Sequence, residues 1–122
     1  MNEKYWVGSV PTEYYDLLNG YVGLPIYQST GLAKHIASRH PGCEQYVNTI
    51  PFIIQNPDYI GISPREKHVS FELVKVMDDN VQIGIKLDLS GRYYYVATLY
   101  TITDAKLKHR LASGRLKPLD QV

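Results

Sequence analysis

Residues 33–41, with the sequence AKHIASRHP, carry the side chains of this chain that are best suited to chemistry. Lys34, His35, Arg39 and His40 place two imidazoles and two permanent cations within one short segment. Imidazole exchanges protons near neutral pH, and lysine and arginine bind phosphate, so the segment is a candidate acid/base and anion site. The alternative is that the cations only complement the helix dipole, which favours positive charge near a helix C-terminus.

Two imidazoles beside cations fit the metal-free cleavage of a phosphodiester. One group removes a proton from the attacking hydroxyl, another protonates the leaving oxygen, and cations neutralise the developing charge. RNA supplies its own nucleophile, because its 2′-hydroxyl lies beside the scissile phosphate. Lys75 adds a cation inside a predicted strand, and Thr98 and Tyr100 add a hydroxyl and a ring to another. The alternatives are that Lys75 marks a solvent side or a protected edge, and that Thr98 and Tyr100 reflect β-propensity.

Other kinds of active site have little support. His35 and His40 are five residues apart, which suits a shared metal ion poorly, and the single cysteine, Cys43, excludes an internal disulfide and a multi-cysteine zinc site. The chain has no glycine-rich phosphate loop and no G-x-S-x-G serine elbow. We therefore expect neither a metal nor another cofactor.

Length and composition predict one domain spanning residues 1–122, since 122 residues with 44% hydrophobic content can bury one core. There is no run of about 18 apolar residues, so we expect a soluble cytoplasmic protein that has no membrane partner. The net charge is +1, but residues 104–122 carry +3 and leave −2 for the remainder. Affinity for nucleic acid must therefore come from local clustering of cations.

Helical patterns dominate the first half of the chain. Apolar spacing predicts a helix that ends before Pro41, which places His40 at a bend, and helical segments over residues 11–18 and 44–55. Pro51 must kink the last of these or begin a second short helix. Short extended pieces are expected at 5–10 and 24–27.

From residue 59 the hydrophobic period changes to two, which is typical of strands. Residues 69–77, 81–89 and 93–102 form an antiparallel meander, joined at one edge by 59–62, and a last helix covers 105–112. We therefore expect an α+β fold, with N-terminal helices packed on one face of a four-stranded twisted antiparallel sheet and a short C-terminal helix. The other face is left free for function and is expected to carry Lys75, Thr98 and Tyr100. Alternation along the last strand places Tyr94 and Val96 on the same face as Thr98, Tyr100 and Ile102.

Four segments, in this order, resemble the phage-associated branch of the barnase/EndoU/colicin/RelE-like (BECR) nucleases: HIASRHP, IIQNPDYI, FELVKV and YYYVATLYTITDAKLKHRLASGRLKP. The resemblance covers about residues 24–118. It implies a BECR-like nuclease fold and metal-independent RNA cleavage that leaves a 2′,3′-cyclic phosphate and a 5′-hydroxyl. By position it implies a helix histidine at His35 with His40 as its partner, and phosphate ligands at Arg39 and Arg115.

The candidate site therefore has a catalytic set and an RNA-binding set. The catalytic residues are His35, His40, Lys75 and Thr98, and the RNA or phosphate contacts are Lys34, Arg39, Tyr100 and Arg115.

The sequence predicts a small ribonuclease of a phage, a prophage or a mobile element. Its partner would be RNA, with transfer RNA among the candidates, in the cytoplasm of a bacterial host cell. A free toxin of this kind needs an inhibitor or immunity protein to protect the producing cell. The alternative is a catalytically inactive domain of nuclease fold that binds nucleic acid or a host protein as an accessory or counter-defence factor.

Overall fold

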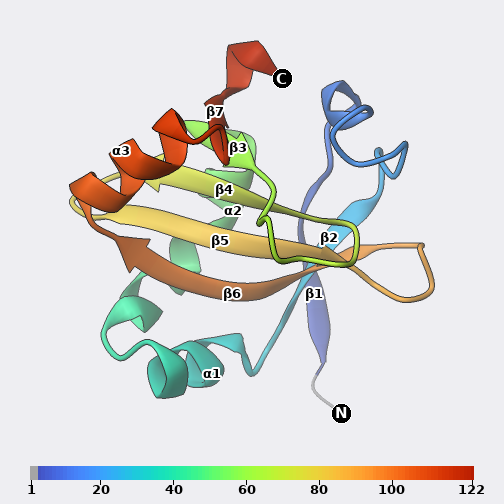
Figure 1. Cartoon of the computed structure of the whole chain (residues 1–122). Coiled ribbons are helices and arrows are strands. Elements are labelled where there is room, and N and C mark those ends of the chain that lie inside the picture. Colours follow the sequence, from blue (N-terminus) through green and yellow to red (C-terminus); the bar gives the residue numbers. More distant parts are fainter. Residues whose placement is uncertain (1–2) are drawn as a thin grey trace.

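The computed structural model describes residues 3–122 as one twisted sheet with helices on both of its faces (Figure 1). Three segments of 3-10 helix accompany the main elements, at Thr12–Tyr14, Cys43–Thr49 and Leu119–Gln121. The main elements in chain order are β1 (Lys4–Ser9), β2 (Pro25–Ser29), α1 (Leu32–Arg39), α2 (Ile50–Gln55), β3 (Tyr59–Gly61), β4 (Ser70–Val76), β5 (Asn80–Leu87), β6 (Tyr94–Ile102), α3 (Asp104–Ala112) and β7 (Leu116–Pro118).

The sheet has seven strands in the order β1-β2-β6-β5-β4-β3-β7. The predicted antiparallel meander is present as β3 to β6, but the prediction of a four-stranded, wholly antiparallel sheet is wrong. The sheet is mixed because β2 pairs in parallel with the first residues of β6. The strand β1 joins the sheet by antiparallel pairing with β2. At the other edge, the three residues of β7 pair with β3.

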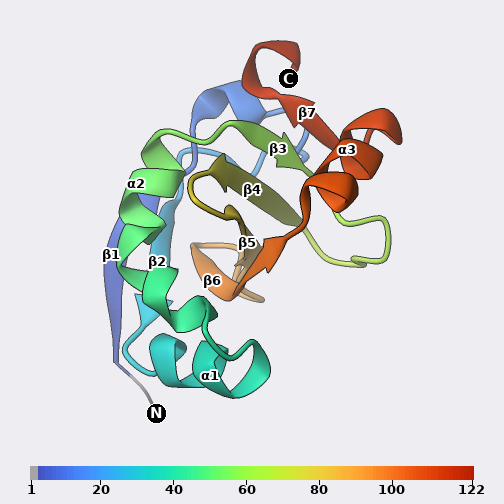
Figure 2. The ribbon, with the colours of Figure 1, turned by 90° about the vertical axis from the view of Figure 1, so that its left-hand side faces the viewer.

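One face of the sheet is buried under α1 and α2, which lie on the same side in Figure 2. Strand alternation points Phe71, Leu73, Ile83 and Ile85 to this side, and each is at most 1% exposed. Burial of such a side chain stabilises the fold by about 1.5–3 kcal/mol. Ile36 of α1 is fully buried among them, so the opposite side of α1 is left facing water.

The last helix, α3, lies on the second face of the sheet, where it covers one end (Figure 2). Leu107 packs there against Val74, Ile102 and Leu116 in a small separate cluster. The helix begins as predicted at Thr103, whose hydroxyl accepts a hydrogen bond from a backbone N–H. The expectation that this face is entirely free is therefore corrected: α3 covers one end, and the part over the middle strands stays open.

A β-bulge in β6 changes which residues share a face. Gly84 pairs with Thr98 and Ile85 with Val96, so Ala97 is an extra residue in β6. The bulge interrupts the alternation of side chains. Val96 and Tyr94 therefore face the helices, whereas Thr98 and the residues after it face the other way. The expectation that all five alternate residues of this strand share one face is wrong for this reason.

Two helical predictions in the first half also differ in detail. Residues 11–18 form only a single 3-10 turn, Thr12–Tyr14, rather than two helical turns. In the segment 44–55, the second of the two alternatives holds, because Pro51 stands in the first turn of a separate helix, α2. None of the helices within residues 3–122 has the length and hydrophobicity to cross a membrane.

Candidate active site

The open part of the second sheet face contains a cleft of about 230 Å³ over β4, β5 and β6, here called the sheet cleft. Its walls come from residues of these strands, from the loop 62–69 and from the turn after α3. The lining residues are Ser63, Glu66, Ser70, Phe71, Glu72, Gly84, Ile85, Lys86, Ala97, Thr98, Tyr100 and Arg115.

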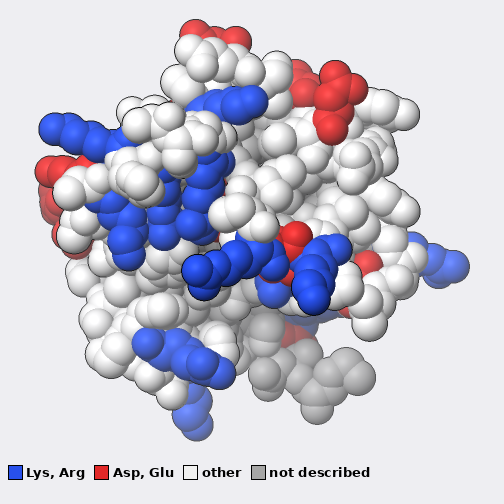
Figure 3. All heavy atoms as spheres, viewed as in Figure 1, with Lys and Arg blue, Asp and Glu red and all other residues white. Residues whose placement is uncertain are grey.

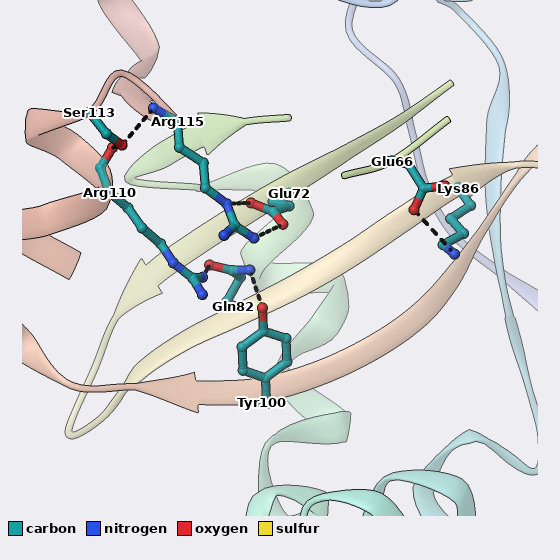
Figure 4. Close-up of polar contacts among 8 residues, drawn as sticks. All are labelled: Glu66, Glu72, Gln82, Lys86, Tyr100, Arg110, Ser113 and Arg115. Atoms are coloured by element: carbon teal, nitrogen blue, oxygen red, sulfur yellow. Dashed lines mark hydrogen bonds and ion pairs between the residues drawn. The ribbon is translucent and has the colours of Figure 1, made fainter. Parts of the chain in front are cut away.

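A carboxylate and a guanidinium form a bidentate pair in this cleft (Figure 4). Glu72 of β4 is 7% exposed and accepts hydrogen bonds from Arg115 Nη2 at 2.6 Å and Nε at 3.1 Å. The hydrogen bond to Glu72 raises the pKa of Arg115 above its usual value, more than burial lowers it, and the Tyr100 hydroxyl adds to the increase. The backbone of Arg115 lies so close to Gly61 that a Cβ there would come within 1.7 Å of the Arg115 carbonyl oxygen.

Tyr100 is the end of a hydrogen-bond chain that begins on α3 (Figure 4). Arg110 donates to Gln82 Oε1, and Gln82 Nε2 donates to the Tyr100 hydroxyl at 2.7 Å. Because a guanidinium can only donate, the amide oxygen must face Arg110 and the amide nitrogen must face Tyr100. The Tyr100 oxygen therefore accepts from Gln82, and its own proton remains free for a ligand.

Arg110 is a buried cation that has no carboxylate partner within residues 3–122. It is 8% exposed, and its guanidinium carbon lies 6.0 Å from the centre of the Tyr100 ring. A buried charge that lacks a counterion is costly. A phosphate bound beside Tyr100 would offset that cost, so Arg110 is a candidate anion ligand.

His40 lies beside Tyr100, in the part of β6 beyond the residues that pair with β2. The two ring centroids are 5.2 Å apart, with the planes tilted by 32°. His40 is the residue that ends α1, and its backbone N–H still donates to Ile36 O at 2.7 Å. Pro41 prevents the helix from continuing, so the bend predicted from the sequence is present and brings this imidazole to the edge of the sheet cleft.

The other three predicted residues of α1 do not line the cleft. Lys34, His35 and Arg39 lie on its exposed side. They form an exposed basic strip on α1. His40, which directly follows this helix, lies at the edge of the cleft.

Lys75 lies on the opposite face of the sheet, under α2. Its ammonium is 3.2 Å from an Asp58 oxygen and 5.4 Å from the centre of the Phe52 ring. The expectation that Lys75 shares a face with Thr98 and Tyr100 is wrong, because the odd-numbered residues of β4 point toward the helices. Of the eight residues predicted from the sequence, the structure brings together His40, Thr98, Tyr100 and Arg115.

Sequence reasoning missed Glu72, Gln82 and Arg110. Glu72 and Gln82 alternate with fully apolar residues in strands whose other polar positions are few, which was a usable signal. Arg110 was counted only as part of the basic C-terminal segment. The burial of Arg110 depends on how α3 packs on the sheet, and this packing cannot be predicted from a local sequence pattern.

A second ion pair closes the far end of the cleft. Lys86 Nζ lies 3.3 Å from a Glu66 oxygen. Burial pushes the pKa of Glu66 up, but the hydrogen bonds from Lys86 and from the backbone N–H groups of His68 and Lys67 outweigh it, so the pKa is lowered. The Glu66 carboxylate in the wall of the cleft is therefore ionised at neutral pH.

Cations gather around the cleft. Figure 3 shows lysine and arginine atoms over α3 and over the middle of this face, with acidic atoms mainly at the rim. The helix α3 contributes Lys106, Lys108 and Arg110. Positive charge around a hollow raises the local concentration of an anionic substrate. Within residues 3–122, no three histidine, cysteine or acidic side chains cluster as a metal site would require.

A larger cavity of about 380 Å³ lies beside β3 and β7, and Arg115 reaches it too. Glu13 and Asp16 stand in its wall. Both carboxylates of the sheet cleft are paired with cations, whereas Glu13 and Asp16 have no ion-pair partner within residues 3–122, so the sheet cleft fits an anionic substrate better.

A protein-family model described as phage-Barnase-EndoU-ColicinE5/D-RelE like nuclease3 matches residues 6–109. The matched part contains all three strands of the sheet cleft and His40, while Arg110 and Arg115 follow it. No curated protein and no solved structure matches the chain.

Proposed function

Because the chain belongs to the phage-Barnase-EndoU-ColicinE5/D-RelE like nuclease 3 family, we propose that its sheet cleft is an endoribonuclease site. The observation that carries the proposal is the convergence on Tyr100 of an imidazole, two guanidiniums and a carboxylate. The His40 ring and the Arg110 guanidinium lie 5.2 Å and 6.0 Å from the centre of its ring, and the Glu72–Arg115 pair stands beside it in the same cleft.

The proposed reaction is an attack of the RNA 2′-oxygen on the adjacent phosphorus. The bond from phosphorus to the 2′-oxygen forms and the bond to the 5′-oxygen breaks, which leaves a 2′,3′-cyclic phosphate and a 5′-hydroxyl. Glu72, a hydrogen-bond acceptor when ionised, takes the proton of the 2′-hydroxyl. His40, on the other side of Tyr100, donates a proton to the leaving 5′-oxygen.

The cations of the cleft supply the charge stabilisation that this reaction needs without a metal ion. Arg115 and Arg110 neutralise the charge that develops on the non-bridging oxygens. The free proton of Tyr100 is donated to one of these oxygens, and Thr98 offers a second hydroxyl. Lys34 and Arg39 of the exposed strip on α1 would hold the backbone of the RNA outside the cleft.

One observation favours the alternative function, a catalytically inactive domain that binds nucleic acid. Both oxygens of Glu72 already accept hydrogen bonds from Arg115. The pair must loosen when substrate binds if Glu72 is to accept a proton. A permanently closed pair would instead be a structural element of a binding surface.

Incubation of the protein with total RNA and with transfer RNA in EDTA tests the proposal. We expect fragments that carry 2′,3′-cyclic phosphate and 5′-hydroxyl ends. Cleavage that stops in EDTA, or that leaves 3′-hydroxyl ends, would contradict the mechanism. Binding with a steep salt dependence but no cleavage would support the inactive domain.

The biological setting is part of the same proposal. A metal-independent ribonuclease encoded by a phage or prophage would act on RNA in the bacterial cytoplasm. If it is a free toxin, an inhibitor protein must cover the sheet cleft. The basic surroundings of the cleft predict that such an inhibitor presents acidic side chains there.

A further inference from the structure

The face that holds the sheet cleft continues across β6, β2 and β1 as a row of aromatic side chains. Tyr95 pairs with Tyr27, and Tyr27 pairs with Trp6, so the three residues stand side by side on adjacent strands. Adjacent strands are about 4.8 Å apart, so the three residues form one row across three strands. Trp6 is 58% exposed and Tyr95 is 38% exposed. Exposed aromatic rings that form one row are unusual on a surface that only faces water.

A groove of about 560 Å³ lies over part of this row, lined by Tyr27, Tyr93 and Tyr95, while Trp6 stands beside Tyr27 outside its lining. Tyr27 and Tyr93 meet edge to face with their centroids 5.6 Å apart, and Lys4 Nζ lies 3.6 Å from the centre of the Tyr93 ring. Asp88 provides a carboxylate at its wall. The groove thus combines ring faces, the cation of Lys4, the carboxylates of Glu3 and Asp88 and the hydroxyl of Ser29.

The groove lies next to the sheet cleft on this face. Lys86 of the cleft pairs with Tyr95 of the groove, and Ala97 and Thr98 of the cleft follow Tyr95 along β6. The bulge at Ala97 is what places Tyr95 and Thr98 on the same face, since strict alternation would separate them. An RNA strand whose phosphate occupies the cleft can therefore place its next nucleotides on the aromatic row.

We propose that the row Trp6, Tyr27 and Tyr95, together with Tyr93, is a subsite for unpaired bases of a single-stranded RNA. This inference rests on the proposed ribonuclease function of the sheet cleft. Every base has a π-face, and rings on a sheet beside a cationic groove are the means by which proteins bind single strands. Asp88 can accept a hydrogen bond from a base N–H, and Lys4 can leave the ring face of Tyr93 to contact a phosphate.

The carboxylates of Glu3 and Asp88 at the wall disfavour a second phosphate inside the groove, whereas stacked bases need no positive charge. Paired bases are excluded by the same geometry, because their faces are covered within a duplex. The proposal is therefore limited to unpaired nucleotides that lie next to the scissile phosphate.

The test measures binding of a fluorescently labelled single-stranded 2′-O-methyl oligonucleotide, which cannot be cleaved through its 2′-oxygen. The variants are Tyr95→Ala and the double variant Tyr27→Ala with Tyr95→Ala, compared with Tyr95→Phe and with Tyr15→Ala as a control. Tyr15 is an exposed tyrosine outside the groove. Because the chain has one tryptophan, Trp6, quenching of its fluorescence reports stacking on the row directly.

We expect the double variant to bind at least about tenfold more weakly, while Tyr95→Phe and Tyr15→Ala bind like the unmodified protein. We also expect saturable quenching of Trp6 by the single strand and none by a duplex of the same sequence. Equal affinity of the double variant and the unmodified protein, or tight binding of the duplex with quenching of Trp6, would overturn the inference. Circular dichroism of each variant checks that the fold is retained.

The binding assay is independent of catalysis, so the two proposals fail separately. Groove binding without any cleavage of unmodified RNA leaves the subsite in place and contradicts the ribonuclease. Cleavage of RNA by a protein whose double variant binds normally contradicts the subsite alone.

Discussion

Replacement of Glu72 by glutamine removes a negative charge from the sheet cleft with almost no change in shape. The amide keeps one acceptor oxygen, so only one of the two hydrogen bonds from Arg115 can persist. If Glu72 is the general base, we expect Glu72→Gln to lower the rate of RNA cleavage by about 10²–10⁴-fold. The loss should appear in kcat, because Arg110 and Arg115, the proposed phosphate ligands, are unchanged.

The same substitution also has a predictable effect on stability. A hydrogen bond to a charged group contributes about 1.5–3 kcal/mol. The Arg115 side chain is 23% exposed, so water can solvate part of what Glu72 no longer contacts. We therefore expect the free energy of unfolding to fall by about 1–2 kcal/mol, which urea denaturation can measure. The domain should remain folded at 25 °C, so the kinetic effect can be measured.

Glu66→Gln is the matched control, because Glu66 lines the same cleft and its removal changes the net charge equally. Its carboxylate is paired with Lys86, whose side chain is 41% exposed, so little stability depends on it. We expect this variant to cleave an oligoribonucleotide at nearly the unmodified rate. Equal losses in both variants would indicate a general electrostatic effect, and an unchanged rate in Glu72→Gln would refute its role as base.

Three further results are expected. Tyr100→Phe keeps the ring that contacts His40 but removes the hydroxyl that accepts from Gln82, so cleavage should fall about tenfold or more while oligonucleotide affinity changes little; an unchanged rate would show that the hydroxyl donates nothing to the phosphate. Lys75→Met should leave the cleavage rate unchanged and lower the free energy of unfolding by at most about 1 kcal/mol, because Lys75 pairs with Asp58 on the opposite face; a large loss of activity would restore it as a catalytic candidate. Burial raises the pKa of Tyr14 to about 12 from its usual 10.0, so its contribution to stability is complete below pH 10 and is lost as the pH rises through about 12. Urea denaturation at pH 9 and pH 11 should accordingly show a smaller alkaline loss in Tyr14→Phe than in the unmodified protein, and equal losses would contradict this account of the hydroxyl.

Local patterns were sufficient for the parts of the fold that depend on neighbours in sequence. The alternation in β5 predicts which of its residues face the core, and Ile83 and Ile85 are indeed fully covered, but Gln82 on the side expected to face water is also buried, where Arg110 of α3 contacts it. Pro41 predicts the end of α1 and the bend at His40, because proline excludes the helical conformation of the residue before it.

Parts of the fold that depend on long-range contacts could not be predicted in the same way. The parallel pairing of β2 with β6 joins residues about 70 positions apart, and nothing in the five residues of β2 specifies that partner. The bulge at Ala97 has no residue signature, yet it decides which side chains of β6 reach the cleft.

The candidate site was likewise only partly predictable from local patterns, because long-range packing determines the rest of it. Thr98 and Tyr100 could be proposed from residue types and Arg115 from the family resemblance, and the structure places them in one cleft with His40 at its edge. Lys75 is a cation among apolar strand residues, and this pattern led to the prediction that it lies on the same face. In β4 the even-numbered residues, among them Glu72, point to the face of the cleft instead.

The most direct test of the central claim is the cleavage of one oligoribonucleotide compared with an otherwise identical oligonucleotide that carries a single 2′-deoxy nucleotide at the scissile position. Because the 2′-oxygen is the proposed nucleophile, the account predicts that the substituted position is not cut, while unmodified positions in the same strand still yield 2′,3′-cyclic phosphate ends in EDTA. Cleavage at the 2′-deoxy position at the unmodified rate would show that another nucleophile attacks the phosphate, and it would contradict the proposed role of the sheet cleft.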